Sequence, residues 1–196
     1  MVNRLTQIYT RTGDEGKTGL GDGTRVAKFS TRIECLGSVD ELNSIIGLIL
    51  TENVSQKNIL KKIQHDLFDI GGELSIPNYK KIDLKKVNFL EQELDRMNDT
   101  LPPLKDFILP GGSKAASYSH LGRTVCRRVE RNLFLLNDKE EVNKNALKYI
   151  NRLSDFLFVF ARYINKENNV DDILWQKDIE YLTNDLSIFS SIFQKN

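Results

Sequence analysis

The segment that most constrains the fold of this chain covers residues 107–136 and reads FILPGGSKAASYSHLGRTVCRRVERNLFLL. Pro110, Gly111 and Gly112 interrupt regular structure, and Ser113 is well placed to cap a helix that begins after it. At about 100° per residue, this helix carries apolar side chains on one side and mostly charged ones on the other. The apolar stripe holds Leu121, Val125, Val129, Leu133 and Leu136; the polar side holds His120, Arg123, Arg127, Glu130 and Arg131. A charged helix face of this kind is usually solvated.

Helical periodicity recurs along most of the chain. The other helical segments are 30–50, 56–74, 84–98 and 142–165, followed by an amphipathic helical tail at 170–196. Within 142–165 the run FLFVFA is apolar almost all round, which predicts a deeply buried helix. We therefore expect an all-α fold, an up-and-down bundle of about five helices with a glycine-rich N-terminal loop. A single domain would hold the N-terminal segment 1–29, the bundle 30–169 and the tail 170–196.

Charge, apolar runs and cysteine content narrow the class of protein. The 196-residue chain has a formal net charge of +1. This charge disfavours a broad nucleic-acid-binding surface but leaves room for a local basic pocket that binds a small anion. No apolar run approaches the roughly 18 residues of a membrane span, and the first residues lack the apolar core of a signal peptide. Cys35 and Cys126 make no disulfide framework, which favours reduced thiols and a cytoplasmic protein.

Residues 7–24 combine glycines with hydroxyl and charged side chains, a composition typical of an ordered loop or a short hairpin. Gly16, Lys17 and Thr18 suggest a phosphate-binding P-loop. That motif fails because Arg11 stands where it needs a glycine, and more glycines follow where a helix must begin. What remains is a set of groups suited to a polyphosphate, namely backbone N–H groups with Thr10, Arg11, Thr12, Lys17, Thr18, Arg25 and Lys28. A plain glycine-rich turn explains the same composition equally well.

Polar residues on the other predicted helices are further candidates. The Asp40 carboxylate could orient an arginine of a neighbouring helix, although a solvated helix residue is the simpler explanation. Asn151 and Asp155 lie one turn apart on the most apolar helix and should enter its packed environment, where an unpartnered polar group costs on the order of 1 to 3 kcal/mol. We expect both to be paired with other helices or with a ligand. His65 has no second histidine or cysteine at ligand spacing, which argues against a structural metal site.

Five separated motifs give a more specific indication. They are YTRTGDEGKTGL near the start, GSVDELNSIIG at 37–47, FILPGG at 107–112, RTVCRRVER at 123–131 and YINRLSD at 149–155. Taken together, and in this order, they resemble the PduO-type ATP:cob(I)alamin adenosyltransferases from about residue 8 to residue 165. The tail from about residue 170 matches none of the family's motifs, and we assign it only packing or oligomer contacts.

The resemblance implies a five-helix bundle that assembles as a homotrimer. ATP would bind at the subunit interfaces, between the N-terminal loop of one subunit and the arginine-bearing helix of another. The residues that would contact phosphates or shape this loop are Thr10, Arg11, Gly13, Lys17 and Lys28.

The resemblance also implies roles for residues of the bundle. Arg123 would pair with Asp40 across the interface, and Arg127 would hold the triphosphate. Glu130 would bind or orient Mg²⁺, and Asn151 would contact the nucleotide. Phe107, in the FILPGG element, would line the corrinoid pocket.

The family's reaction transfers the 5′-deoxyadenosyl group of ATP to the cobalt of reduced cob(I)alamin, giving adenosylcobalamin and triphosphate. The cobalt is itself the nucleophile, so no side-chain nucleophile or general base is needed, and the chain shows no Ser-His-Asp or Cys-His constellation. The expected requirements are ATP, Mg²⁺ and cobalamin as substrate, with a Co(II) reductase and an adenosylcobalamin-dependent client enzyme as partners. The alternative is a non-catalytic bundle that binds ATP or corrinoid and delivers cofactor to a client enzyme.

Overall fold

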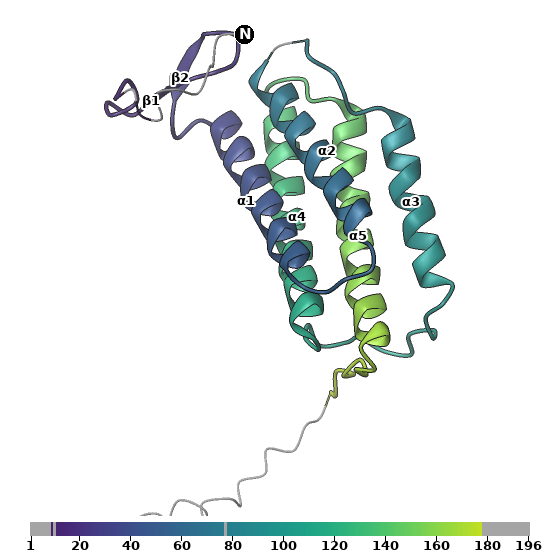
Figure 1. Ribbon diagram of the computed structural model, residues 1–196. Coiled ribbons are helices and arrows are strands. Elements are labelled where there is room, and N and C mark those ends of the chain that lie inside the picture. The colour runs from purple at the N-terminus through teal and green to yellow at the C-terminus, as the bar shows by residue number, and fades with distance from the viewer. Residues whose placement is uncertain (1–8, 10, 77, 178–196) are drawn as a thin grey trace, which may run out of the picture.

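The computed structural model describes residues 9, 11–76 and 78–177. In this part of the chain a two-stranded antiparallel sheet precedes five α-helices (Figure 1). The strands are β1 (Lys17–Gly19) and β2 (Arg25–Ala27), and the helices are α1 (Thr31–Thr51), α2 (Lys57–Ser75), α3 (Leu84–Asn98), α4 (Lys114–Asn137) and α5 (Lys144–Glu167). The predicted all-α bundle of five helices is confirmed.

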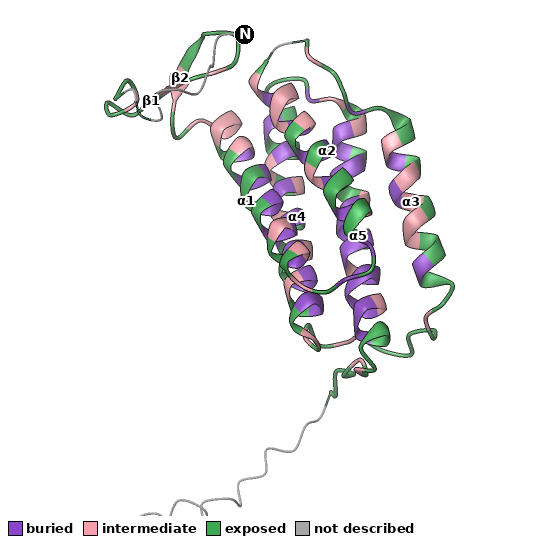
Figure 2. Ribbon diagram, in the orientation of Figure 1, coloured by how far each residue is buried: buried purple, intermediate pink, exposed green. Residues whose placement is uncertain are grey.

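The helices pack side by side, with α1 against α2 and α4, and with α5 against α4 and α3. Figure 2 shows that their buried residues face the interior of the bundle. Helix α5 contributes the largest fully buried side chains of the core, Tyr149, Phe156 and Phe160. Its apolar run therefore forms the deeply buried helix that the sequence predicts, and it fixes the positions of α3 and α4 on either side.

Helix α4 begins where the sequence predicts, because the Ser113 hydroxyl accepts a hydrogen bond from the Ala116 N–H at 3.3 Å. The predicted faces of this helix are only partly correct. Leu121 is 48% exposed, although the pattern places it on the apolar stripe, whereas His120 is 3% exposed, although the pattern places it among the charged residues. The buried face also includes small residues that an apolar pattern overlooks, Ala115, Ala116, Ser119, Gly122 and Cys126.

The N-terminal segment forms a short hairpin in which Lys17 pairs with Ala27. Because a strand begins at Lys17, the P-loop interpretation is excluded by the structure as well as by the sequence. The hairpin is attached to the end of α2, since the Gly21 N–H donates to the carbonyl oxygen and the hydroxyl of Ser75, each at 2.9 Å. A Cβ at Gly21 would lie 2.5 Å from the Ile76 side chain, so this close approach requires glycine.

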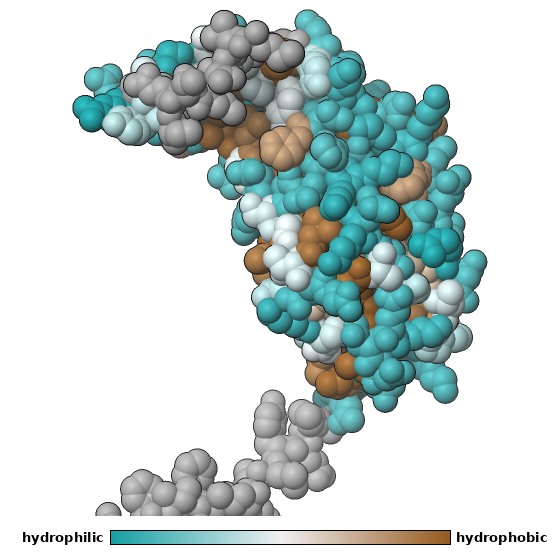
Figure 3. All heavy atoms as spheres, viewed as in Figure 1, coloured by the Kyte–Doolittle hydropathy of each residue, from teal (hydrophilic) through white to brown (hydrophobic). Residues whose placement is uncertain are grey.

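The chain after α5 departs from the prediction. Residues 170–177 contain no helix, and Leu174 instead forms an antiparallel bridge with Ile108. The remainder of the predicted tail helix, 178–196, lies outside the described residues. Within the described ranges, no helix combines the length and the apolar character needed to cross a bilayer. The face shown in Figure 3 is mostly hydrophilic, and its apolar side chains form separate patches.

Candidate active site

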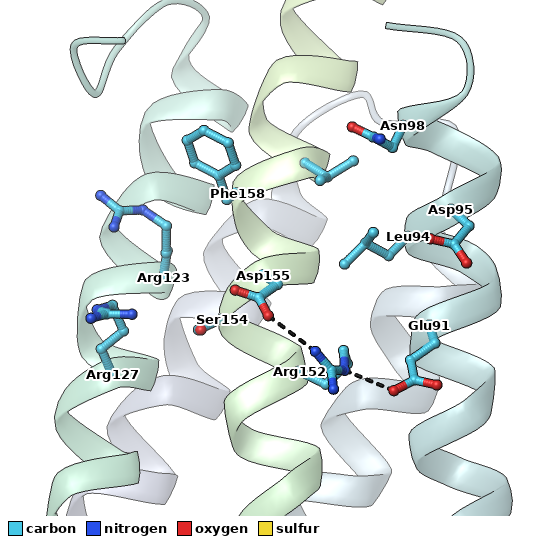
Figure 4. Close-up of a pocket in the computed structure, with 11 residues that line it drawn as sticks. Glu91, Leu94, Asp95, Asn98, Arg123, Arg127, Arg152, Ser154, Asp155 and Phe158 are labelled. Carbon is cyan, nitrogen blue, oxygen red and sulfur yellow. Dashed lines mark hydrogen bonds and ion pairs between the residues drawn. The ribbon is translucent and has the colours of Figure 1, made fainter. Parts of the chain in front are cut away.

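Helices α3, α4 and α5 line a cavity of about 600 Å³, drawn in Figure 4 and here called the arginine cleft. Helix α4 contributes two arginines to one wall, α3 lies opposite, and α5 forms the floor between them. The lining residues are Glu91, Leu94, Asp95, Asn98, Arg123, Arg127, Arg152, Ser154, Asp155, Phe158 and Val159. The packing of α5 between α3 and α4 therefore creates the site.

The three arginines of the cleft differ in their partners. Arg152 donates to Glu91 at 2.9 Å and lies 3.4 Å from Asp155, so its charge is already neutralised (Figure 4). Arg123 and Arg127, one turn apart on α4, make no ion pair with any residue that the structure describes. Two adjacent unneutralised cations in a cleft are suited to a polyanion.

Arg123 carries the clearest sign of a missing partner. Its Nε is buried and makes no hydrogen bond within the described residues. Burial lowers the pKa of its guanidinium, and repulsion from Arg127 lowers this pKa further. A buried donor without an acceptor is unfavourable, so an anionic group bound here would relieve the electrostatic conflict between the two arginines.

A second hollow of about 550 Å³ adjoins the cleft and includes Phe107 and Ile108 of the lead-in to α4. Both hollows are lined by Arg123 and Phe158, so they meet at these two side chains. Phe107 itself is 79% exposed, an unusual state for a large aromatic ring. A cationic cleft is thus joined to a partly apolar hollow, and one molecule with a polyphosphate and one with a large apolar face could meet between them.

Glu130 and Asn151 lie beside the cleft rather than in its lining. The Asn151 Nδ2 donates to Glu130 Oε1 at 2.7 Å, which joins α5 to α4. The expectation that Asn151 and Asp155 are paired is confirmed, with Arg152 as the partner of Asp155, but the expectation that they are buried is wrong. Both face solvent because they lie on the side of α5 that the neighbouring helices leave open.

The described residues hold no cluster of three or more histidine, cysteine, aspartate or glutamate side chains that could bind a metal ion. Mg²⁺ commonly binds through one or two carboxylates together with the phosphates of a substrate. Glu130, half-buried and oriented by Asn151, is a carboxylate that fits this mode.

The N-terminal candidates form a separate group. Arg11 and Lys17 line a hollow of about 460 Å³ in the N-terminal segment. The ammonium group of Lys28 lies close to Gly13, where an added Cβ would be 3.2 Å from Nζ. None of these four residues lines the arginine cleft, and Thr10 lies outside the described residues. Within one chain, the predicted phosphate-binding residues are therefore divided between two places.

Asp40 is exposed on α1, and its carboxylate makes no hydrogen bond or ion pair with the described residues. It does not contact Arg123 of the same chain. The pairing of these two residues across a subunit interface stays a prediction.

Most residues that line the cleft are absent from the predicted set, and three residues of this region are informative. Arg152 and Phe158 line the cleft, and His120 packs edge-on against Phe158 with ring centroids 6.2 Å apart. Phe158 belongs to the run FLFVFA, whose apolar character hides it among core residues. Its spacing from Asn151 and Asp155 is the signal that could have identified it, because all three fall on one side of a helix.

Comparison with known proteins adds a consistent assignment. Residues 8–164 match the family model described as cobalamin adenosyltransferase. A cobalamin adenosyltransferase from Cupriavidus metallidurans is 53% identical over 183 residues, which are 92% of this chain and 100% of the relative. A corrinoid adenosyltransferase from Bacillus subtilis is 44% identical over 180 residues, with coverage of 87% and 93%.

A solved structure agrees with these sequence relatives. It is a variant PduO-type ATP:corrinoid adenosyltransferase from Lactobacillus reuteri complexed with cobalamin and ATP. It superposes with a TM-score of 0.84 at 36% identity, covering 87% of this chain and 97% of that one.

Proposed function

The chain belongs to the cobalamin adenosyltransferase family, and we propose that its arginine cleft is where ATP adenosylates the cobalt of a reduced corrinoid. The protein is a corrinoid adenosyltransferase that uses ATP. The observation that carries the proposed location is the junction of the two hollows at Arg123 and Phe158. The cationic hollow suits the triphosphate, and the hollow next to Phe107 suits the corrinoid.

The reaction requires little of the side chains beyond position and charge. The Co(I) electron pair forms the bond to C5′ of ATP, the C5′–O bond breaks, and the triphosphate leaves with that bond's electrons. No proton is transferred in this step, so it needs no general base. Arg127 and Arg123 stabilise the charge that grows on the leaving triphosphate, because each guanidinium can donate two parallel hydrogen bonds to phosphate oxygens.

Glu130 is the proposed Mg²⁺ ligand, and Asn151 both orients its carboxylate and lies within reach of the nucleotide. A divalent cation held there would supply further positive charge next to the triphosphate. The hydrogen bond from Asn151 occupies one lone pair of Glu130 Oε1. The second lone pair of Oε1 and both lone pairs of Oε2 remain available to bind the cation.

Phe107 is the proposed wall of the corrinoid hollow. An aromatic ring beside the cobalt excludes water and the corrinoid's own base from the lower axial position, and a cobalt without that ligand is easier to reduce to Co(I). Phe107→Ala removes no core packing, since the ring is 79% exposed. We expect the substitution to lower the rate of adenosylation while ATP binding and thermal stability stay unchanged. Equal turnover in the variant would remove Phe107 from the site and favour a module that only binds ATP.

We propose that the complete site forms between subunits of a homotrimer. Two observations support this: the basic N-terminal group lies apart from the arginine cleft, and both Asp40 and Arg123 have side-chain atoms that the described residues leave unpaired. In the trimer, Arg11, Lys17 and Lys28 with Gly13 and Thr10 would close over ATP held by the neighbouring cleft. Asp40→Asn should weaken the trimer in sedimentation velocity. A normal trimer with normal turnover would contradict the pairing.

The direct test of the function is an anaerobic assay with ATP, Mg²⁺ and chemically reduced cobalamin. The expected products are light-sensitive adenosylcobalamin and free triphosphate in equal amounts. Formation of ADP and phosphate without a cobalt–carbon bond would refute the proposal and favour a nucleotide hydrolase. In the cell, a reductase must supply Co(I), and an adenosylcobalamin-dependent enzyme must receive the product.

We also propose a cytoplasmic location. Cys35 and Cys126 are both free and buried, and burial raises the pKa of the Cys35 thiol to about 11. Thiols of this kind serve as core residues and require no oxidising compartment.

A further inference from the structure

The segment after α5 is hydrogen-bonded to the loop that carries Phe107. The Trp175 N–H donates to the Phe107 carbonyl oxygen at 2.7 Å, and the Leu109 N–H donates to the Ile173 carbonyl oxygen at 2.8 Å. Together with the antiparallel bridge between Ile108 and Leu174, these two hydrogen bonds form a short ladder. The backbone of Phe107 is therefore held from the C-terminal side of the chain.

An ion pair between the buried Arg162 and the partly buried Asp172 fixes the start of this ladder. Arg162 on α5 is 5% exposed, and its Nε donates to Asp172 at 2.7 Å. Its Nη2 donates to the Pro102 carbonyl oxygen at 2.9 Å. The buried Arg162 guanidinium thus joins α5 to Pro102, which precedes the Phe107 loop, and to Asp172, which precedes the ladder. Removing Asp172 would leave the buried charge of Arg162 uncompensated, so this ion pair, here called the latch, is costly to break.

The other end of the loop is held by the same helix. Asn165, one turn from Arg162 and also buried, accepts from the Ser113 N–H at 2.9 Å and donates to the Gly111 carbonyl oxygen at 3.2 Å. Two buried polar residues of α5 thus hold both ends of the loop. The catalytic chemistry proposed above uses neither of them.

We infer that residues 170–177, latched by Arg162 and Asp172, form a positioning element for the corrinoid side of the reaction. The inference rests on the proposed function, in which Phe107 lines the corrinoid hollow. Because the Phe107 ring is 79% exposed, side-chain packing does little to fix it, and the backbone ladder sets where the ring lies. Arg162 and Asp172 act through Phe107 and are positioning residues, not catalytic ones.

The test compares Asp172→Ala with Asp171→Ala in the full chain. Asp171 is adjacent, exposed and without an ion pair to the described residues, so its substitution removes a carboxylate but not the latch. Trp175 is the single tryptophan of the sequence and reports on the ladder directly. In Asp172→Ala we expect red-shifted emission and stronger acrylamide quenching. We also expect kcat/KM for the corrinoid to fall about tenfold or more, while KM for ATP stays unchanged.

Asp171→Ala should behave as the wild type in every measurement. Two results would overturn the inference: exposure of Trp175 in Asp172→Ala with unchanged corrinoid kinetics, or no change in either. A wild-type protein that makes no adenosylcobalamin would instead refute the proposed function, and so the two failures are distinct.

A second pair of variants leaves the Arg162–Asp172 ion pair intact. Trp175→Pro removes the N–H that bonds to Phe107, whereas Trp175→Ala keeps that N–H and removes only the indole. The extended backbone of the ladder suits the residue before a proline, so folding is preserved. We expect the proline variant to lose more corrinoid kcat/KM than the alanine variant. Equal values in the two variants would contradict a role for the ladder.

Discussion

Replacement of Arg127 by lysine tests the proposed phosphate site most directly. The side chain of Arg127 is exposed in the cleft and makes no hydrogen bond or ion pair with the described residues. The substitution keeps the charge but removes the planar fork that can bind two phosphate oxygens at once. Because no internal contact is lost, the free energy of unfolding should change by no more than about 0.5 kcal/mol.

The expected effect on catalysis is much larger. A hydrogen bond to a charged group contributes about 1.5 to 3 kcal/mol, and we expect Arg127→Lys to lose one such bond to the triphosphate. That loss corresponds to a decrease of roughly 10- to 150-fold in kcat/KM for ATP. In the proposed site the corrinoid would occupy the hollow beside Phe107, which Arg127 does not line, so KM for the corrinoid should change little.

The assay is steady-state adenosylation at saturating corrinoid with varied ATP. Arg131→Lys is the matched control, because Arg131 lies one turn along α4, is exposed and does not line the cleft. Its Nη1 donates only to the Arg127 carbonyl oxygen, at 3.2 Å. If Arg127→Lys and Arg131→Lys gave the same kcat/KM for ATP, the assignment of the cleft to the triphosphate would be refuted.

Two further predictions concern stability. Burial and the charge of Arg123 lower the pKa of His120 from 6.5, so the unfolded chain binds more protons than the folded one as pH falls through this value, and stability is lost towards acid. The free energy of unfolding of His120→Gln, measured in urea, should therefore depend less on pH. An unchanged pH dependence would contradict this role of His120. Gly112 has φ +98°, and a Cβ there would lie 2.3 Å from the Asn165 side chain. Gly112→Ala should therefore destabilise the protein by on the order of 1 to 3 kcal/mol. Gly111→Ala, which meets open space, should leave Tm nearly unchanged.

The five helices could be predicted because each carries a long apolar period that only a helix can bury on one side. The rotation of α4 could not be predicted as well, since small residues complete its buried face. Gly122 lies against Ile45 and Leu157, and the Ser119 hydroxyl is satisfied by the Leu157 carbonyl oxygen at 2.8 Å. A pattern based on large apolar residues therefore assigns Leu121 and His120 to the wrong faces.

The candidate site was partly predictable for chemical reasons. Arg123 and Arg127 are one turn apart on a capped helix, and such a spacing places two cations side by side whatever the rest of the fold. The contact between residues 170–177 and the Phe107 loop is different, because it depends on the Arg162–Asp172 ion pair and on backbone hydrogen bonds between distant segments. Local periodicity carries no information about either, and the amphipathic pattern of the tail accordingly predicts a helix.

The unpaired arginines imply a last prediction about ligand binding. Repulsion between Arg123 and Arg127, neither of which has an ion-pair partner among the described residues, is unfavourable, and a bound polyphosphate would relieve it. Inorganic tripolyphosphate should therefore raise Tm, whereas adenosine, which lacks the anion, should not. A ligand at about 100 times its Kd stabilises by about 2.7 kcal/mol. This shift should shrink in Arg127→Lys and persist in Arg131→Lys. A rise in Tm with adenosine but not with tripolyphosphate would show that the cleft recognises the nucleoside, and that the two arginines serve another purpose.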